Sequence, residues 1–174
     1  MDIPVIGPGE TGLHYASLLG NSFGVVTLKE EGFLQAWRDV IYNAGLQTKA
    51  IADPVRGVSL SSYEVATNGI ADVSLIVQAV EERARDLVND GAEVVVVGCS
   101  LFSPLCTASG LVTLDGNVPI VDVMAISLKM AEFMVDLKNA IDLPALSRVG
   151  RYQPLRDKDI HRLGTHFGVD TQSS

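Results

Sequence analysis

The sequence is short of cysteine, tryptophan and basic residues. Its 174 residues include two cysteines and one tryptophan, and 13 lysines and arginines stand against 21 aspartates and glutamates, a formal net charge of −8. Because a nucleic-acid-binding protein needs a basic face to neutralise phosphates, we expect no nucleic-acid partner. Two cysteines do not make a disulfide framework, so we expect reduced thiols and a cytoplasmic location.

Long hydrophobic runs and metal-ligand patterns are also absent. No apolar run approaches the roughly 20 residues that a membrane-spanning helix requires, so we expect no membrane partner. The N-terminus has no basic segment and no long apolar stretch, and we expect no secretory signal. Histidines, cysteines and carboxylates nowhere have the spacing of a metal site, so we predict no metal. Gly7-Pro8-Gly9 is not a dinucleotide fingerprint, because Pro8 removes an N–H.

Short apolar runs alternate with longer segments of helical periodicity, and 47% of the residues are hydrophobic. This alternation predicts an α/β fold, a three-layer arrangement of a parallel sheet with helices on both faces. The predicted strands are residues 3–6, 23–28, 48–51, 93–98 and 118–121, and the predicted helices are 10–19, 30–44, 72–90, 101 or 104 to 111, 122–137 and 157–163. Residues 53–68 are expected to form a long loop. We predict one domain over 1–145 and a polar tail over 146–174.

The ends of the predicted strands hold the candidate site. Ligands of open parallel sheets bind beyond the carboxyl ends of the strands, where residues 7–10, 27–29 and 98–100 form turns. Gly98 lets the backbone approach a ligand closely. Cys99 lies where a buried strand gives way to a helix, and free amide N–H groups and the helix dipole at such a place favour a thiolate and bind anions. Cys99 is therefore a candidate acid/base, and the alternative is a small buried apolar residue.

Other candidates have equally ordinary alternatives. Glu10 could line the same crevice or be a first-turn acid favoured by the helix dipole. Thr27 ends a strand near the crevice but is also a common strand residue. Asp122 is interpreted as a helix cap. Cys106 follows Cys99 by about two helical turns, so we give it a structural role.

Three blocks of the chain resemble the aspartate/glutamate/hydantoin racemase family in order and approximate spacing. They are Ile3-Pro4-Val5-Ile6-Gly7-Pro8-Gly9-Glu10 with His14-Tyr15-Ala16-Ser17-Leu18-Leu19-Gly20 and Phe23-Gly24-Val25-Val26-Thr27, then Val94-Val95-Val96-Val97-Gly98-Cys99-Ser100, then Val118-Pro119-Ile120-Val121-Asp122. The resemblance covers about residues 3–137 and is nearest to the hydantoin/allantoin racemase branch. It implies a two-lobed protein with the active site between pseudo-symmetric lobes, and this chain corresponds to the second lobe.

The resemblance also implies a mechanism. One thiolate takes the α-proton of the substrate and a thiol of the opposite lobe returns a proton, with no metal or other cofactor. Cys99 matches the second-lobe cysteine, and Gly98 and Ser100 match the turn that holds the substrate, with Glu10 and Thr27 as further predicted contacts. The chain starts at a strand from the middle of the family, so we expect the first lobe and its cysteine to be missing.

We therefore predict a cofactor-independent racemase or epimerase of hydantoin-like or Asp/Glu-like amino-acid derivatives, with a small anionic or amide substrate. It would be inactive alone unless a partner chain supplies the second thiol. Two alternatives stay open: a single-cysteine decarboxylase of malonate-like acids, and a non-catalytic anion-binding or interaction domain. The surface that would face a missing lobe should be apolar, so we expect a homo-oligomer.

Overall fold

The structure is a computed structural model that describes residues 3–147, 149, 153 and 155–168. The chain divides into two compact units, one of Val5–Phe133 and one of the described residues within 1–4 and 134–174. The first unit contains the sheet and every candidate site residue, so it is the one described in detail.

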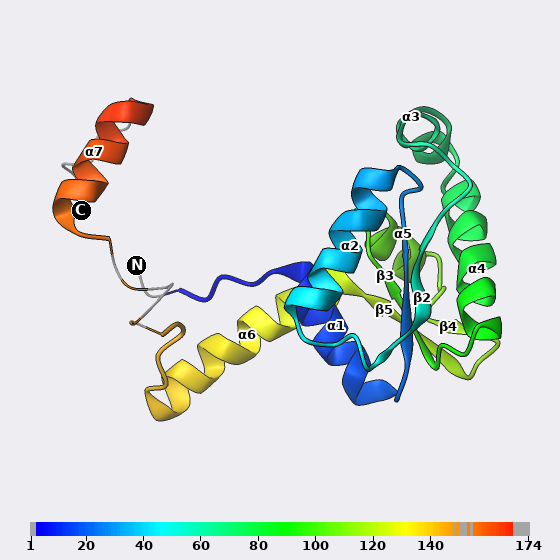
Figure 1. The fold of residues 1–174 in the computed structure, drawn as a ribbon, viewed down its shortest axis with the longest axis horizontal. Helices are drawn as coiled ribbons and strands as arrows, with labels where there is room; N and C mark the ends of the chain where they lie inside the picture. The colour runs from blue at the N-terminus through cyan, green and yellow to red at the C-terminus, as the bar shows by residue number, and fades with distance from the viewer. Residues whose placement is uncertain (1–2, 148, 150–152, 154, 169–174) are drawn as a thin grey trace. The chain divides into compact units, whose positions relative to one another are not determined.

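A five-stranded sheet forms the centre of the Val5–Phe133 unit (Figure 1). Its spatial order is β2-β1-β3-β5-β4. The strands are β1 (Phe23–Thr27), β2 (Ala50–Gly57), β3 (Val94–Val97), β4 (Thr113–Leu114) and β5 (Val118–Asp122). Strands β2, β1, β3 and β5 pair in parallel, whereas β4 joins β5 antiparallel. The predicted α/β fold is confirmed, and β4 is an antiparallel addition to it.

Helices cover both faces of the sheet. The helical segments are α1 (Pro8–Leu19), α2 (Glu31–Asn43), α3 (Ser62–Glu64), the π-helix η1 (Val65–Gly69), α4 (Val73–Asn89), α5 (Phe102–Ala108), α6 (Val123–Ile141) and α7 (Asp157–Phe167). Helices α1 and α2 lie on one side of the sheet and α4 and α5 on the other (Figure 1). The apolar residues of the two helix pairs belong to two separate buried clusters. The four valines of β3 are fully buried between these layers. Each contributes roughly 1.5–3 kcal/mol through its burial.

The predicted strand over residues 3–6 is wrong. Residues 3–7 belong to no helix or strand, and α1 begins at Pro8. Pro4 has no N–H to donate to a ladder, so the apolar run lacks a complete set of the hydrogen-bonding groups that a strand needs.

The segment predicted as a strand over 48–51 and a loop over 53–68 is also different. Strand β2 continues to Gly57, and the chain then forms α3 and η1. The register with β1 jumps, with Phe23 opposite Ala50 but Val25 opposite Val55, so the extra residues around Pro54 leave the ladder. An edge strand tolerates proline there because one side of it needs no partner. The pair Ser61 and Glu64 forms a capping box, a visible sequence pattern that predicts a helix start.

Within the described ranges, no helix has the length and apolar character needed to cross a membrane. The same residues contain no group of three or more His, Cys, Asp or Glu side chains able to hold a metal ion.

Candidate functional site

Cys99 lies directly beyond the carboxyl end of the central strand β3. The strand is fully buried, Gly98 and Cys99 are half-buried, and Ser100 is exposed, so the chain passes from core to surface within three residues. Cys99 packs on one side against the apolar cluster beneath α4 and α5. Because it keeps part of its surface exposed, the thiol stands at the rim of the core and can meet a ligand.

Hydrogen bonds fix the backbone on both sides of this thiol. The Gly98 N–H donates to the Val26 carbonyl at 2.7 Å, and the Ser103 N–H donates to the Cys99 carbonyl at 2.9 Å. In the part of the chain that the structure describes, the N–H groups of Cys99 and Ser100 donate to no protein acceptor. The turn therefore offers two amide donors beside a half-exposed thiol, an arrangement that stabilises an anion or an enolate oxygen.

Trp37 of α2 contacts this turn, and sequence reasoning gave it no part in the site. Its indole Nε1 donates to the Gly98 carbonyl at 2.7 Å. A Cβ at position 98 would lie only 2.4 Å from Cε2 of the Trp37 ring, and one at position 9 would lie 3.3 Å from its Cη2. The ring therefore lies between the two glycine-containing turns that hold Glu10 and Cys99.

Ser103 and Asp122 connect the end of β3 to the end of β5. Ser103 is fully buried, and its hydroxyl donates to the Val97 carbonyl at 2.6 Å and accepts from the Val123 N–H at 3.2 Å. One oxygen of Asp122 accepts the amide N–H groups at the start of α6, and the other accepts the Thr107 hydroxyl at 2.8 Å. The interpretation of Asp122 as a helix cap is confirmed.

Cys106 is closed off from the site. It is 1% exposed, on the face of α5 that packs into the core. Burial, with smaller contributions from the nearby Asp122 and Cys99, raises the pKa of its thiol to about 12. The thiol is therefore protonated at neutral pH and inaccessible, which supports a structural role.

The other predicted site residues also lie near the carboxyl ends of the parallel strands, but their side chains differ in exposure. Glu10 is an exposed residue in the first turn of α1, with its carboxylate 3.9 Å from His14 Nε2. Ser100 is exposed immediately after Cys99. Thr27 is 1% exposed, and its hydroxyl faces the Gly98 carbonyl at 3.5 Å. The substrate contacts of Glu10, Thr27, Gly98 and Ser100 stay predictions.

The turn after β1 is tied to the segment after β2. Lys29 donates to the Ser59 carbonyl at 2.8 Å, and one Glu30 oxygen accepts both the N–H and the hydroxyl of Ser62 at 2.7 Å. The backbone hydrogen bond from Ser62 is the main cause that lowers the pKa of Glu30. Polar contacts at the carboxyl ends of β1 and β2 thus fix the segment of residues 59–62, which was predicted as part of a long loop.

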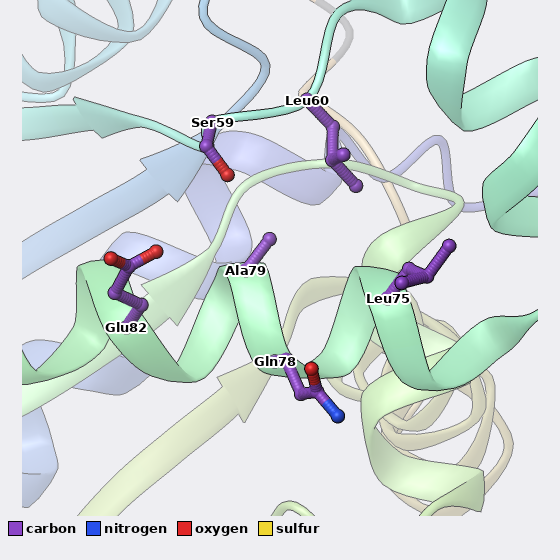
Figure 2. A pocket seen from close by; sticks show the side chains of 6 residues that line it. All are labelled: Ser59, Leu60, Leu75, Gln78, Ala79 and Glu82. Atoms are coloured by element: carbon purple, nitrogen blue, oxygen red, sulfur yellow. The ribbon is translucent and has the colours of Figure 1, made fainter.

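A hollow of about 380 Å³ lies between this segment and α4 (Figure 2). It is lined by Ser59, Leu60, Leu75, Gln78, Ala79 and Glu82. In Figure 2, Ala79 points from α4 toward Ser59 and Leu60, whereas Gln78 points away. None of the predicted site residues lines it, so it is separate from the Cys99 turn.

The fold and the turn define a class: an α/β domain of parallel strands with a half-exposed thiol at the end of its central strand. Residues 1–131 match the family described as Asp/Glu/Hydantoin racemase. The match spans most of the chain, and the protein belongs to this family. The predicted resemblance is confirmed.

Proteins of known activity show the same relationship. The hydantoin racemase of Pseudomonas sp. (strain NS671) is 25% identical over 136 residues, covering 78% of this chain and 51% of that protein. The allantoin racemase from Klebsiella pneumoniae has a TM-score of 0.69 at 27% identity, covering 88% of this chain and 58% of its own. The allantoin racemase from Pseudomonas fluorescens has a TM-score of 0.63 at 26% identity, covering 90% and 60%. The chain thus spans between one half and three fifths of these relatives.

Proposed function

We propose that this chain carries one catalytic thiol, Cys99, of a racemase for hydantoin-like or Asp/Glu-like amino-acid derivatives. The observation that carries the proposal is the half-exposed Cys99 at the end of β3, next to amide groups with no protein acceptor. The hydantoin and allantoin racemases among its relatives support a small cyclic amide as the substrate. We propose that residues 1–145 form the racemase-like domain and 146–174 a polar tail.

In the proposed mechanism, the Cys99 thiolate removes the proton on the carbon next to the substrate carbonyl. The C–H electron pair moves into the carbonyl to give an enolate, and the amide groups of Cys99 and Ser100 donate to its oxygen. Gly98 lets the backbone lie close to the substrate, and Glu10 and Thr27 are further substrate contacts. A second acid then returns a proton to the opposite face of the carbon. Both steps are proton transfers between carbon and sulfur, so the proposal invokes no metal or other cofactor.

The second acid must come from elsewhere than Cys106. That thiol is buried, and it lies on the same helix that follows Cys99. We propose that a partner chain supplies the thiol for the opposite face. The chain by itself would then exchange the α-proton with solvent without inverting the carbon efficiently.

The test separates proton removal from inversion. A single enantiomer of a 5-substituted hydantoin is incubated with protein in D₂O, and α-deuteration is followed by NMR while optical rotation reports inversion. We expect deuteration above the buffer rate in the wild type and in Cys106→Ala. Cys99→Ala should lose about 100-fold or more of this rate, the usual contribution of a general base. Exchange that survives Cys99→Ala would contradict the assigned role, and buffer-rate exchange in the wild type would favour a non-catalytic domain.

A second candidate function follows from the burial of the Cys106 side chain. It leaves one accessible thiol, which suits an enzyme that decarboxylates malonate-like acids and protonates the resulting enolate once. Release of carbon dioxide from an arylmalonate, lost in Cys99→Ala, would favour this candidate. Hydantoin deuteration without any such release would favour the racemase.

We also propose that a second copy of the chain covers the exposed apolar face of α6. Met124 and Leu128, one helical turn apart on this face, are 39% and 61% exposed. A helix that is apolar over so much of its surface is normally covered by another element. We expect a dimer or larger by light scattering, and dissociation in Leu128→Glu but not in the neighbouring exposed variant Lys129→Gln. A monomeric wild type would contradict the proposal.

A further inference from the structure

We propose that Trp37 is a positioning residue for Cys99, because its indole N–H holds the carbonyl of the Gly98–Cys99 peptide. The inference rests on the proposed function, in which Cys99 is the acid/base. It goes further by assigning a role to a residue of α2, distant from Cys99 in sequence.

The contact between the indole and the turn is close and directional. Nε1 of Trp37 lies 2.7 Å from the Gly98 oxygen, and Trp37 is 9% exposed. Three ring atoms would lie within 2.7 Å of a Cβ at position 98, so the ring occupies the volume that any other residue there would need. The bond satisfies a buried indole N–H, and the acceptor it uses is the carbonyl of the peptide that leads into Cys99.

The bond sets the direction of the Cys99 amide. The Gly98–Cys99 peptide bond is trans, and in a planar trans peptide the C=O and N–H groups point to opposite sides. Holding the Gly98 carbonyl toward Trp37 therefore turns the Cys99 N–H away from the indole. The other neighbouring groups, the Gly98 N–H and the Cys99 carbonyl, are bonded to Val26 and Ser103. Of the backbone groups on either side of the Gly98–Cys99 peptide, the Cys99 N–H is the one left to meet a ligand, next to the N–H of Ser100.

The same ring also touches the turn before Glu10. Gly9, in the first turn of α1, faces the ring: a Cβ at this position would lie 3.3 Å from Cη2 of Trp37 and 3.3 Å from Cγ1 of Val40, in the same helix α2. One indole thus sets the separation between the turn of Glu10 and the turn of Cys99, the two sides proposed to contact the substrate. Donation to the Gly98 oxygen also polarises that peptide and strengthens its N–H as a donor to an anionic oxygen.

The test measures the reactivity of Cys99 and does not depend on turnover. In a Cys106→Ala background, Cys99 is the only thiol, and its alkylation by iodoacetamide is followed against pH. Trp37→Phe keeps an aromatic ring and removes the N–H, so we expect alkylation at pH 7 to slow about threefold to tenfold, as loss of one hydrogen bond implies, and the pH profile to move upward. The control Ile41→Val changes a buried side chain one turn further along α2 and should leave the rate unchanged. Equal rates in Trp37→Phe and the wild type, or equal slowing in Ile41→Val, would overturn the proposal.

A second measurement covers the case in which Trp37→Phe does not fold. Trp37 is the sole tryptophan, so ¹⁵N labelling gives one indole N–H resonance. We expect this resonance to exchange slowly with solvent and to shift when Cys99 is alkylated; a rapidly exchanging or unshifted resonance would overturn the proposal. If hydantoin deuteration is absent from the wild type while these results hold, the proposed function fails and the positioning of Cys99 by Trp37 stands.

Discussion

Replacing Gly98 by alanine is expected to destabilise the protein by about 3 kcal/mol, the combined size of overpacking and of a lost buried hydrogen bond. The added Cβ would lie 2.4, 2.6 and 2.7 Å from three atoms of the Trp37 ring. The ring has to shift, and its N–H then leaves the Gly98 carbonyl. The displaced carbonyl belongs to the peptide before Cys99, so hydantoin deuteration should fall as well.

Urea unfolding followed by tryptophan fluorescence measures this change. The matched control is Gly32→Ala in α2, where a Cβ meets nothing within 4 Å and helix propensity favours alanine by roughly 0.5–1 kcal/mol. Gly98→Ala combined with Trp37→Leu, followed by circular dichroism, should be more stable than the sum of the two single changes, because the smaller side chain makes room. An unchanged urea midpoint in Gly98→Ala would contradict the prediction, because it would show that the indole moves aside without lowering the free energy of unfolding.

Raising the pH above 9 is expected to destabilise the protein through Cys106. Burial holds the pKa of this thiol at about 12, against 9.0 for an unperturbed thiol. Between these values the unfolded chain loses the thiol proton while the folded protein keeps it, so deprotonation favours unfolding. The contribution of protonated Cys106 to the free energy of unfolding is complete below pH 9. Above pH 9 it decreases by up to about 1.4 kcal/mol per pH unit.

The measurement compares wild type and Cys106→Ala by urea unfolding at pH 7, 9, 10 and 11. Lysines and tyrosines titrate in both proteins, so the difference between their free energies of unfolding isolates Cys106. This difference should be constant up to pH 9 and then change in favour of the variant. Parallel curves up to pH 11 would mean that the thiol ionises in the folded protein.

The central part of the fold could be predicted from the sequence because its patterns are local. Four consecutive valines predict a strand buried on both faces, and β3 is that strand. The place of Cys99 follows from it, since the residue comes directly after Gly98 at the strand's end. Asp122 was interpreted as a cap for the same reason: its partners lie two and three residues ahead.

The contacts that hold the site could not be predicted because they join distant segments. Trp37 shows in sequence only as an apolar residue at helical spacing, and its acceptor lies 61 positions away. Ser103 likewise has no local pattern that predicts a bond to the start of α6. The continuation of β2 from Ile51 to Gly57 could not be predicted because Pro54 breaks a strand in most settings but not at the edge of a sheet.

The two outermost strands have a consequence for how copies of the chain meet. Strand β2 departs from its ladder around Pro54, and β4 is only two residues long. Blunted edges of this kind offer no template on which another strand could add, which protects against fibre-like stacking from chain to chain. The self-association proposed through α6 would therefore face little competition from strand addition at the edges of the sheet.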